Sequence, residues 1–203
     1  MGLRQIGARD DLGGAWIADI DGGMVILDIS DKARPKMVSR WDYHPPYHGF
    51  THTVVPFFDR NLLIVSDECV RTEGADWPKL VWVVDGRTET NPVPIATCPL
   101  PPLDHYMRKG ARYGAHNLYE NLPKPNAWKS DRIVLATYFN GGLRAYDTTN
   151  PYQPAEVAYF VPAPPDRAPS GAIQINDVFV DERKVVYTVD RHVGGLYTLE
   201  MDF

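Results

Sequence analysis

Short apolar runs of strand length, separated by turn residues, recur along the whole chain. Examples are NLLIVSD (61–67), KLVWVVD (79–85) and RIVLATYF (132–139). Glycine, proline and β-branched residues interrupt every window long enough to show the 3.6-residue period of a helix. Runs of this length bounded by turn signals are typical of β-strands. The pattern therefore predicts an all-β protein.

Three segments repeat one phrase: two apolar residues, an acidic residue, a polar turn ending in proline, and another apolar run. They span 22–41, 80–100 and 141–161, and a fourth segment, 194–203, begins the same phrase. The acidic position falls at Asp28, Asp85, Asp147 and Glu200, and we expect the three aspartates to hold the turns that follow them. Repeats of this length are typical of solenoid turns or propeller blades.

The strand-like runs group into units at about 15–41, 52–100, 116–161 and 176–203, with three, four, four and three strands. Four-stranded antiparallel sheets repeated in this way predict a β-propeller, whereas an irregular β-sandwich would not explain the repeated phrase. The first unit is expected to lack its innermost strand and the last its outermost. We therefore favour residues 1–203 as the C-terminal part of a larger ring over a small four-bladed ring, and two chains could also complete one ring.

The segment VILDISD (25–31) closely matches the phrase for which the LVIVD-repeat propeller family is named. Together with LVWVVD (80–85) and DVFVDERKVVYTVDRHVGGLYTLE (177–200), it resembles a bacterial branch of that family, and the resemblance covers nearly the whole chain from about Ala15. It implies a seven-bladed ring with further blades upstream, and it implies little about function. More distant seven-bladed relatives, of the selenium-binding or methanethiol-oxidase type, hold a metal with histidines on one propeller face, which is an analogy only.

Composition narrows the function classes. The formal net charge is −5, without a basic run, which argues against a sequence-independent nucleic-acid binder. No apolar stretch approaches the roughly 18 residues of a membrane span. The N-terminal residues lack the features of a signal peptide, so a cytoplasmic location is predicted. Two cysteines are too few for a disulfide framework.

All six histidines fall in segments expected at one face of the blades: His44, His48, His52, His105, His116 and His192. The innermost strands align as THTVVP, AHNLYE and INDVFV, which places His52, His116 and Asn176 at equivalent positions near the axis. Imidazoles from neighbouring blades can form a divalent-metal site, with His52 and His116 as the ligands. The alternative is a structural role, in which both rings donate to backbone carbonyls of the repeat.

Carboxylates near this face are predicted to take ligand or acid–base roles. A period of two places Glu120 on the same side of its strand as His116, as a ligand, a partner of the imidazole or a general base. Asp67 and Glu68 end a second strand and lead into a long loop rather than a glycine turn. The residues expected to shape a substrate pocket are His48, His105, Tyr106, Arg108, Tyr138 and His192, and Arg112 lies in the same basic loop as Arg108.

Two functions fit these features. The first is a metal-dependent enzyme acting on a small aromatic or carbonyl-bearing molecule by hydrolysis, isomerisation or oxidation. The second is a non-catalytic propeller that binds a protein partner or a ligand on the same face. A chain that needs a second copy or a complementing propeller segment is compatible with both.

Overall fold

The structure, a computed structural model, describes residues 3–9, 13–103 and 109–202. Its strands are β1 (Leu3–Arg9), β2 (Gly14–Asp19), β3 (Gly23–Asp28), β4 (Lys36–Trp41), β5 (Thr51–Phe57), β6 (Leu62–Asp67), β7 (Val81–Asp85), β8 (Val93–Thr97), β9 (Ile133–Thr137), β10 (Leu143–Asp147), β11 (Ala155–Phe160), β12 (Ile175–Val180), β13 (Val185–Asp190) and β14 (Leu196–Glu200). A short 3-10 helix, η1 (Phe58–Arg60), follows β5.

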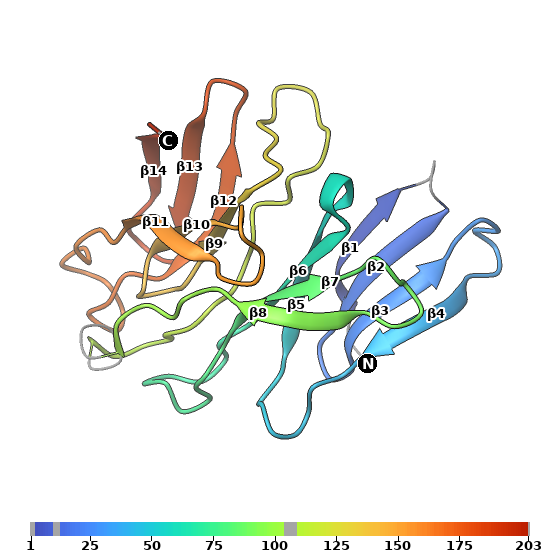
Figure 1. Cartoon of the computed structure of the whole chain (residues 1–203). Helices are drawn as coiled ribbons and strands as arrows, with labels where there is room; N and C mark the ends of the chain where they lie inside the picture. The colour runs from blue at the N-terminus through green and yellow to red at the C-terminus, as the bar shows by residue number, and fades with distance from the viewer. Residues whose placement is uncertain (1–2, 10–12, 104–108, 203) are drawn as a thin grey trace.

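The strands form four antiparallel sheets in the orders β1-β2-β3-β4, β5-β6-β7-β8, β9-β10-β11 and β12-β13-β14. The sheets follow one another along the chain like the blades of a propeller, and the ring is not closed (Figure 1). The all-β prediction and the antiparallel blade-like sheets are confirmed. In the described part of the chain, no helix is long and apolar enough to cross a membrane.

The first sheet has four strands, so the prediction that it lacks its innermost strand was wrong. β1 pairs with β2 along its length, from Leu3 opposite Asp19 to Arg9 opposite Gly14. Its sequence, LRQIGAR, carries too few apolar residues to be recognised as a strand. Its position is fixed instead by backbone pairing with β2 and by its neighbour β5.

In the third sheet, the segment 116–121 was predicted as a strand but is irregular. Backbone bonds run from His116 N to the Thr137 carbonyl (2.9 Å) and from Tyr119 N to the Leu135 carbonyl (2.9 Å). Between them the Thr137 hydroxyl contacts Asn117 N (3.1 Å), so a side chain interrupts the ladder. The segment therefore follows β9 at the place of an innermost strand without regular pairing.

The turn aspartates act as predicted. Asp28, Asp85 and Asp147 each accept a hydrogen bond from the backbone N–H two residues ahead, at 2.9, 2.9 and 2.7 Å. In these three sheets, the pairs β3–β4, β7–β8 and β10–β11 shift register immediately before the aspartate. These shared bonds and bulges are the structural content of the repeated phrase.

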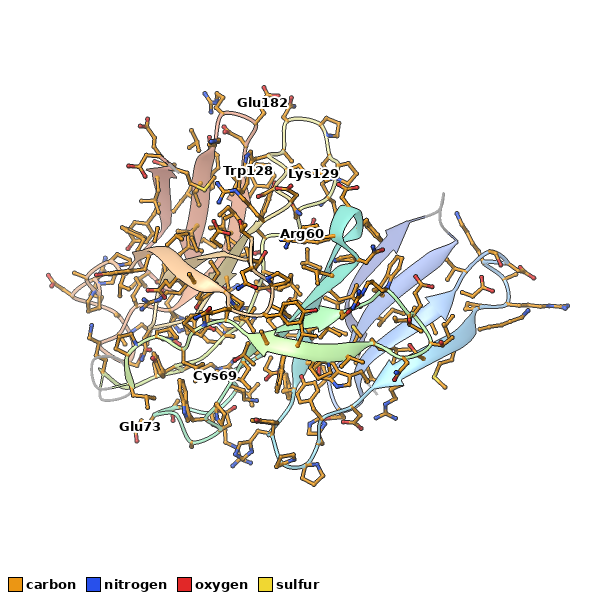
Figure 2. The ribbon with its side chains drawn as sticks, in the orientation of Figure 1. Arg60, Cys69, Glu73, Trp128, Lys129 and Glu182 are labelled. Atoms are coloured by element: carbon orange, nitrogen blue, oxygen red, sulfur yellow. The ribbon has the colours of Figure 1, made fainter. Side chains whose placement is uncertain are left out.

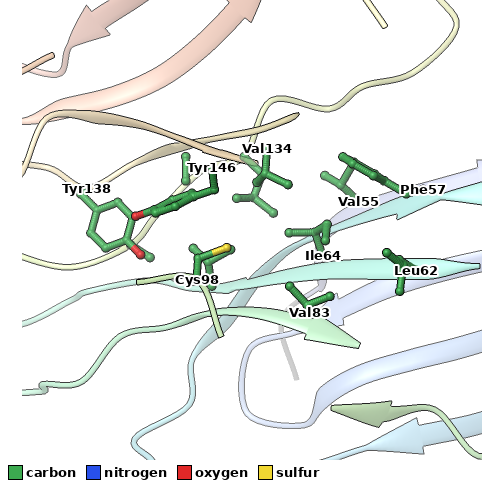
Figure 3. Packing of buried hydrophobic residues seen from close by; sticks show 13 residues of the cluster. Val55, Phe57, Leu62, Ile64, Val83, Cys98, Val134, Tyr138 and Tyr146 are labelled. Carbon is green, nitrogen blue, oxygen red and sulfur yellow. The ribbon is translucent and has the colours of Figure 1, made fainter. Parts of the chain in front are cut away.

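Apolar layers fill the spaces between neighbouring sheets. Figure 3 shows one such layer, where Val55, Ile64 and Val83 of the second sheet face Val134 and Tyr146 of the third. Fully burying each aliphatic side chain contributes about 1.5–3 kcal/mol relative to leaving it exposed. Each blade is therefore stabilised by its neighbours as well as by its own hydrogen bonds.

Glycine pairs connect β2 to β3, β9 to β10 and β13 to β14. The second glycine of each pair has a positive φ: +79° at Gly23, +79° at Gly142 and +77° at Gly195. A Cβ on Gly23 would lie 2.1 Å from the carbonyl oxygen of Trp41, at the end of β4. A Cβ on Gly142 would lie 2.2 Å from the carbonyl oxygen of Phe160, at the end of β11. A Cβ on Gly195 would meet nothing within 4 Å, because no described strand pairs with the outer edge of β14.

This difference predicts unequal costs for the same substitution. Gly142→Ala combines left-handed backbone strain with a clash against backbone, and should lower the free energy of unfolding by roughly 2–5 kcal/mol. Gly195→Ala carries only the strain and should cost about 1–2 kcal/mol. Urea denaturation of the two variants measures both, and equal losses would contradict the assignment.

Candidate functional site

The loops that follow the second strands lie at one end of the blades. In Figure 2, Cys69 and Glu73, which come after β6, lie at the lower end of the molecule. Arg60 of η1, Trp128 and Glu182 lie at the opposite end. The lower end is the face on which the sequence places the histidines.

Three side chains of the predicted site converge at this end. His52 Nε2 lies 3.6 Å from Glu68 Oε2, and His116 Nε2 lies 3.7 Å from Glu68 Oε1. One ligand atom from each of the three residues falls within 4.8 Å of the other two. The side chains of His52, Glu68 and His116 are only 13%, 8% and 8% exposed. The two imidazole rings also contact each other, with centroids 4.5 Å apart, so the structure brings one carboxylate against the Nε2 atoms of two adjacent imidazoles, largely out of water.

Irregularities in the innermost strands bring these side chains to the site. Thr51 pairs with Asp67 and Thr53 with Ser66, so His52 is the extra residue of a β-bulge. Asn176 holds the same position in β12, where Ile175 pairs with Asp190 and Asp177 with Val189. Bulges of this kind redirect a side chain away from its regular position in the strand.

The backbone around His116 joins three blades. The Ser66 hydroxyl of β6 donates to the His116 carbonyl (2.6 Å). On the other side, His116 Nδ1–H donates to the carbonyl oxygen of Asn176 (2.8 Å). Because a carbonyl oxygen only accepts, this contact places the ring proton on Nδ1 and the lone pair on Nε2.

Burial makes His116 a neutral imidazole. Loss of hydration lowers its pKa to about 3, and the His52 ring and the Arg191 and Arg112 guanidiniums act in the same direction. His52 is held by a second contact, 2.9 Å between its Nδ1 and the Thr53 hydroxyl. Both rings therefore direct Nε2 toward Glu68, with Nδ1 engaged elsewhere.

Glu68 has a further partner, Arg112, which the sequence placed in a basic loop without a role at this site. Arg112 NH1 donates to Glu68 Oε1 (2.9 Å) and to the Cys69 carbonyl (3.4 Å). The Arg112 guanidinium also lies over the Phe139 ring, 5.4 Å from its centroid. The His116 ring stacks on the same phenyl ring, with centroids 4.6 Å apart. Phe139 and Thr53 lie in strand segments that the sequence predicted, but nothing in the sequence marked either as a residue of the site.

Asp67 does not reach the site. It is fully buried, and it accepts hydrogen bonds from the Tyr43 hydroxyl, from Leu80 N (3.1 Å) and from Trp82 Nε1 (3.4 Å). Burial raises its pKa to about 6, against the opposing effect of the Tyr43 bond. Successive residues at the end of a strand point to opposite sides, so Asp67 faces the interior when Glu68 faces the histidines.

Glu120 and Tyr138 also lie elsewhere. Glu120 is exposed, pairs with Lys124, and lines a small pocket with Asp177 and Phe179 rather than facing His116. Its predicted position failed because the segment 116–121 is not a regular strand, so the period of two does not apply. Tyr138 is fully buried in the core cluster with Tyr146 and Cys98 and has no access to a pocket at this face (Figure 3).

The remaining predicted pocket residues are peripheral or undescribed. His48 and His192 are exposed. His192 lines an open cleft that also contains Arg112. His105, Tyr106 and Arg108 lie outside the described residues.

The three converging side chains fit a metal ion. A tetrahedral site with bonds of about 2.1 Å has ligand atoms roughly 3.4 Å apart, close to the separations between Glu68 and the two Nε2 atoms. Imidazole and carboxylate ligands suit zinc and the other divalent first-row metals. Nδ1 partners that fix the ring orientation are the usual surroundings of histidine ligands.

The buried network around Asp67 predicts a stability effect separate from the site. Tyr43→Phe removes a hydroxyl that donates to Asp67 and lies 2.6 Å from the Thr51 hydroxyl. The free energy of unfolding should fall by about 1–3 kcal/mol, because the buried carboxylate loses a donor. Tyr47→Phe, at a ring that is 37% exposed and packs edge-on against Trp82, is the matched control and should change the free energy of unfolding by less than about 0.5 kcal/mol. Chemical denaturation compares the two, and equal effects would argue against the network.

Comparison with known proteins supports the repeat. The family model described as the LVIVD repeat matches residues 14–43, which span β2, β3 and β4. The chain matches none of the curated proteins with which it was compared. The chain therefore contains an LVIVD repeat at residues 14–43, which confirms the predicted LVIVD phrase in the first sheet and is consistent with the LVIVD-repeat family.

Proposed function

We propose that this protein is a divalent-metal-dependent enzyme acting on a small molecule, with His52, Glu68 and His116 as the metal ligands. One observation carries the proposal: a hydrogen-bond acceptor on His116 faces the Glu68 carboxylate across 3.7 Å. The Asn176 carbonyl occupies the only ring proton of neutral His116, so its Nε2 cannot donate to Glu68. The Arg112 guanidinium donates to the same Glu68 Oε1, but its bond is to the carboxylate and leaves the His116 Nε2 lone pair facing it. Two facing acceptors in a buried site favour a cation or a proton donor bound between them.

A second feature supports a polar ligand at this position. The side-chain Oδ1 of Asn176 is buried and has no hydrogen-bond partner among the described residues. The carbonyl of the same residue accepts a hydrogen bond from His116, so this oxygen belongs to a residue of the fourth sheet that contacts the site. An unpaired buried oxygen is costly, and a ligand or a water bound to one would satisfy it.

The chemistry follows from the ligand set. Three protein ligands leave a coordination position for water or substrate, as in catalytic rather than structural metal sites. A metal bound there would polarise an oxygen of the substrate or lower the pKa of a bound water. Glu68 supplies the negative charge, Arg112 restrains its Oε1, and the Nδ1 contacts fix both imidazoles.

The experiment is metal analysis of the purified protein, followed by calorimetric titration of the chelator-treated protein with Zn²⁺, Mn²⁺ and Fe²⁺. We expect one equivalent of metal, lost in His52→Ala, His116→Ala and Glu68→Gln. His48→Ala and Glu120→Gln, at exposed positions on the same chain, should keep it. Metal at 100 times its Kd should also stabilise the native protein by about 2.7 kcal/mol.

The opposite result is equally clear. If no preparation binds metal, and the three variants are only less stable than the native protein, the histidines have a structural role. A propeller that binds a protein or ligand without catalysis would then be the better description.

The contact between His52 Nδ1 and the Thr53 hydroxyl gives a prediction about metal affinity. Thr53 is fully buried, and Thr53→Val keeps its shape while removing the hydroxyl beside Nδ1. Metal affinity should fall by about 10–100-fold with one equivalent still bound at saturation. Thr188→Val, which removes a buried hydroxyl that donates to the Asp177 carbonyl, is the control and should leave the affinity unchanged. Equal metal affinity in both variants would show that Thr53 does not orient a ligand.

A further inference from the structure

We propose that the cleft beside these three residues binds the anionic oxygen group, carboxylate or phosphate, of the substrate, with Arg191 and Arg112 as its cationic contacts. The assignment of this anion as substrate rests on the proposed function. The cleft itself is defined independently of any metal.

The cleft has a volume of about 660 Å³ and is open to solvent. Its walls come from the loop after β6, the segment 110–112, the segment 169–174 and the β13–β14 turn. The size is that of a site for a small molecule. Its charged lining residues are Arg112, Arg191 and Glu73, with His192 beside them.

Hydrogen bonds hold one wall of the cleft in place. Arg112 N donates to Gln174 Oε1 (3.2 Å), and Gln174 Nε2 donates back to the Arg112 carbonyl (3.2 Å). Arg191 N donates to the Gln174 carbonyl (2.9 Å), and Gln174 N donates to buried Asp190 Oδ1 (2.7 Å). The backbones that carry the two arginines are therefore fixed through one glutamine, which reduces the ordering cost of binding.

Both guanidiniums lie against the same aromatic ring. The Cζ atoms of Arg112 and Arg191 are 5.4 and 5.5 Å from the Phe139 centroid. A guanidinium against an aromatic ring keeps N–H groups available at its edge, where a carboxylate or phosphate accepts them in pairs. Arg191 is exposed, so an incoming anion can reach it without displacing a buried ion pair.

The charge in the cleft is nearly balanced before a metal is bound. Glu68 neutralises Arg112, and Glu73 opposes Arg191 among the described lining residues. A divalent cation held by His52, Glu68 and His116 would add net positive charge at the inner end. The Phe139 ring, which His116 also contacts, keeps the cleft adjacent to that centre. An anion bound at Arg191 would thus place the rest of a small molecule near the metal ligands.

The test uses inorganic phosphate and malonate as probes, titrated calorimetrically into metal-loaded and into chelator-treated protein. We expect the native protein to bind at least one of them, and Arg191→Gln to weaken that binding by at least about tenfold. Arg191→Lys should retain part of the affinity. Arg34→Gln, which removes an exposed turn arginine in the first sheet, should retain all of it. Metal stoichiometry should be unchanged in Arg191→Gln.

The outcomes separate the two proposals. If metal is absent but phosphate or malonate binding still depends on Arg191, the proposed function fails and the anion site stands. If one equivalent of metal binds but the anion affinity is the same in Arg191→Gln, the anion site is overturned. It is also overturned if neither probe binds, or if binding is lost with the metal and is insensitive to Arg191. The probe that binds more tightly shows whether the cleft prefers a phosphate or a carboxylate.

Discussion

The site depends on one hydrogen bond, from His116 Nδ1 to the Asn176 carbonyl. It fixes the tautomer of a buried imidazole and so decides that Nε2 presents a lone pair to Glu68. The site requires the fourth sheet to supply the Asn176 carbonyl, the segment 116–121 to supply the His116 ring, and the end of the second sheet to supply the Glu68 carboxylate. No single blade contains the arrangement, so the packing of three blades is a condition for it.

The repeat and the chemistry are carried by different residues. The turn aspartates Asp28, Asp85 and Asp147 occur in equivalent positions and make the same bond in three of the four sheets. His52, His116 and Asn176 share another repeat position, where the innermost strands have bulges or irregular pairing. A repeat of this kind allows one strand end to change its geometry while the neighbouring layers keep the blade stable.

This separation explains which features the sequence could predict. The strand pattern and the turn aspartates are local and periodic, so they could be identified without coordinates. Aligning the innermost strands also placed His52, His116 and Asn176 correctly relative to one another, because a shared repeat position implies a shared spatial position. β1 was missed because its apolar pattern is weak and its stability comes from pairing with β2.

Errors in the site came from assuming regular strands. Glu120 was placed beside His116 by a period that the irregular segment 116–121 does not follow. Asp67 and Glu68 were equivalent in sequence, and only the direction of their side chains separates a core acceptor from a site carboxylate. Arg112 and Arg191 lie far apart in the chain, and only the folded structure brings them together, through the ring of Phe139 and the bonds of Gln174.

Arg112 connects the two parts of the site physically. It donates to the Glu68 carboxylate, which faces both imidazoles, and it lines the cleft beside them. A carboxylate shared between a guanidinium and a metal divides its charge between the two, so an anion that engages Arg112 would draw that guanidinium from Glu68. Through this one residue, occupancy of the cleft would alter the charge that Glu68 presents to the metal position. If a metal and an anion both bind as proposed, Arg112 is the residue through which each would influence the other.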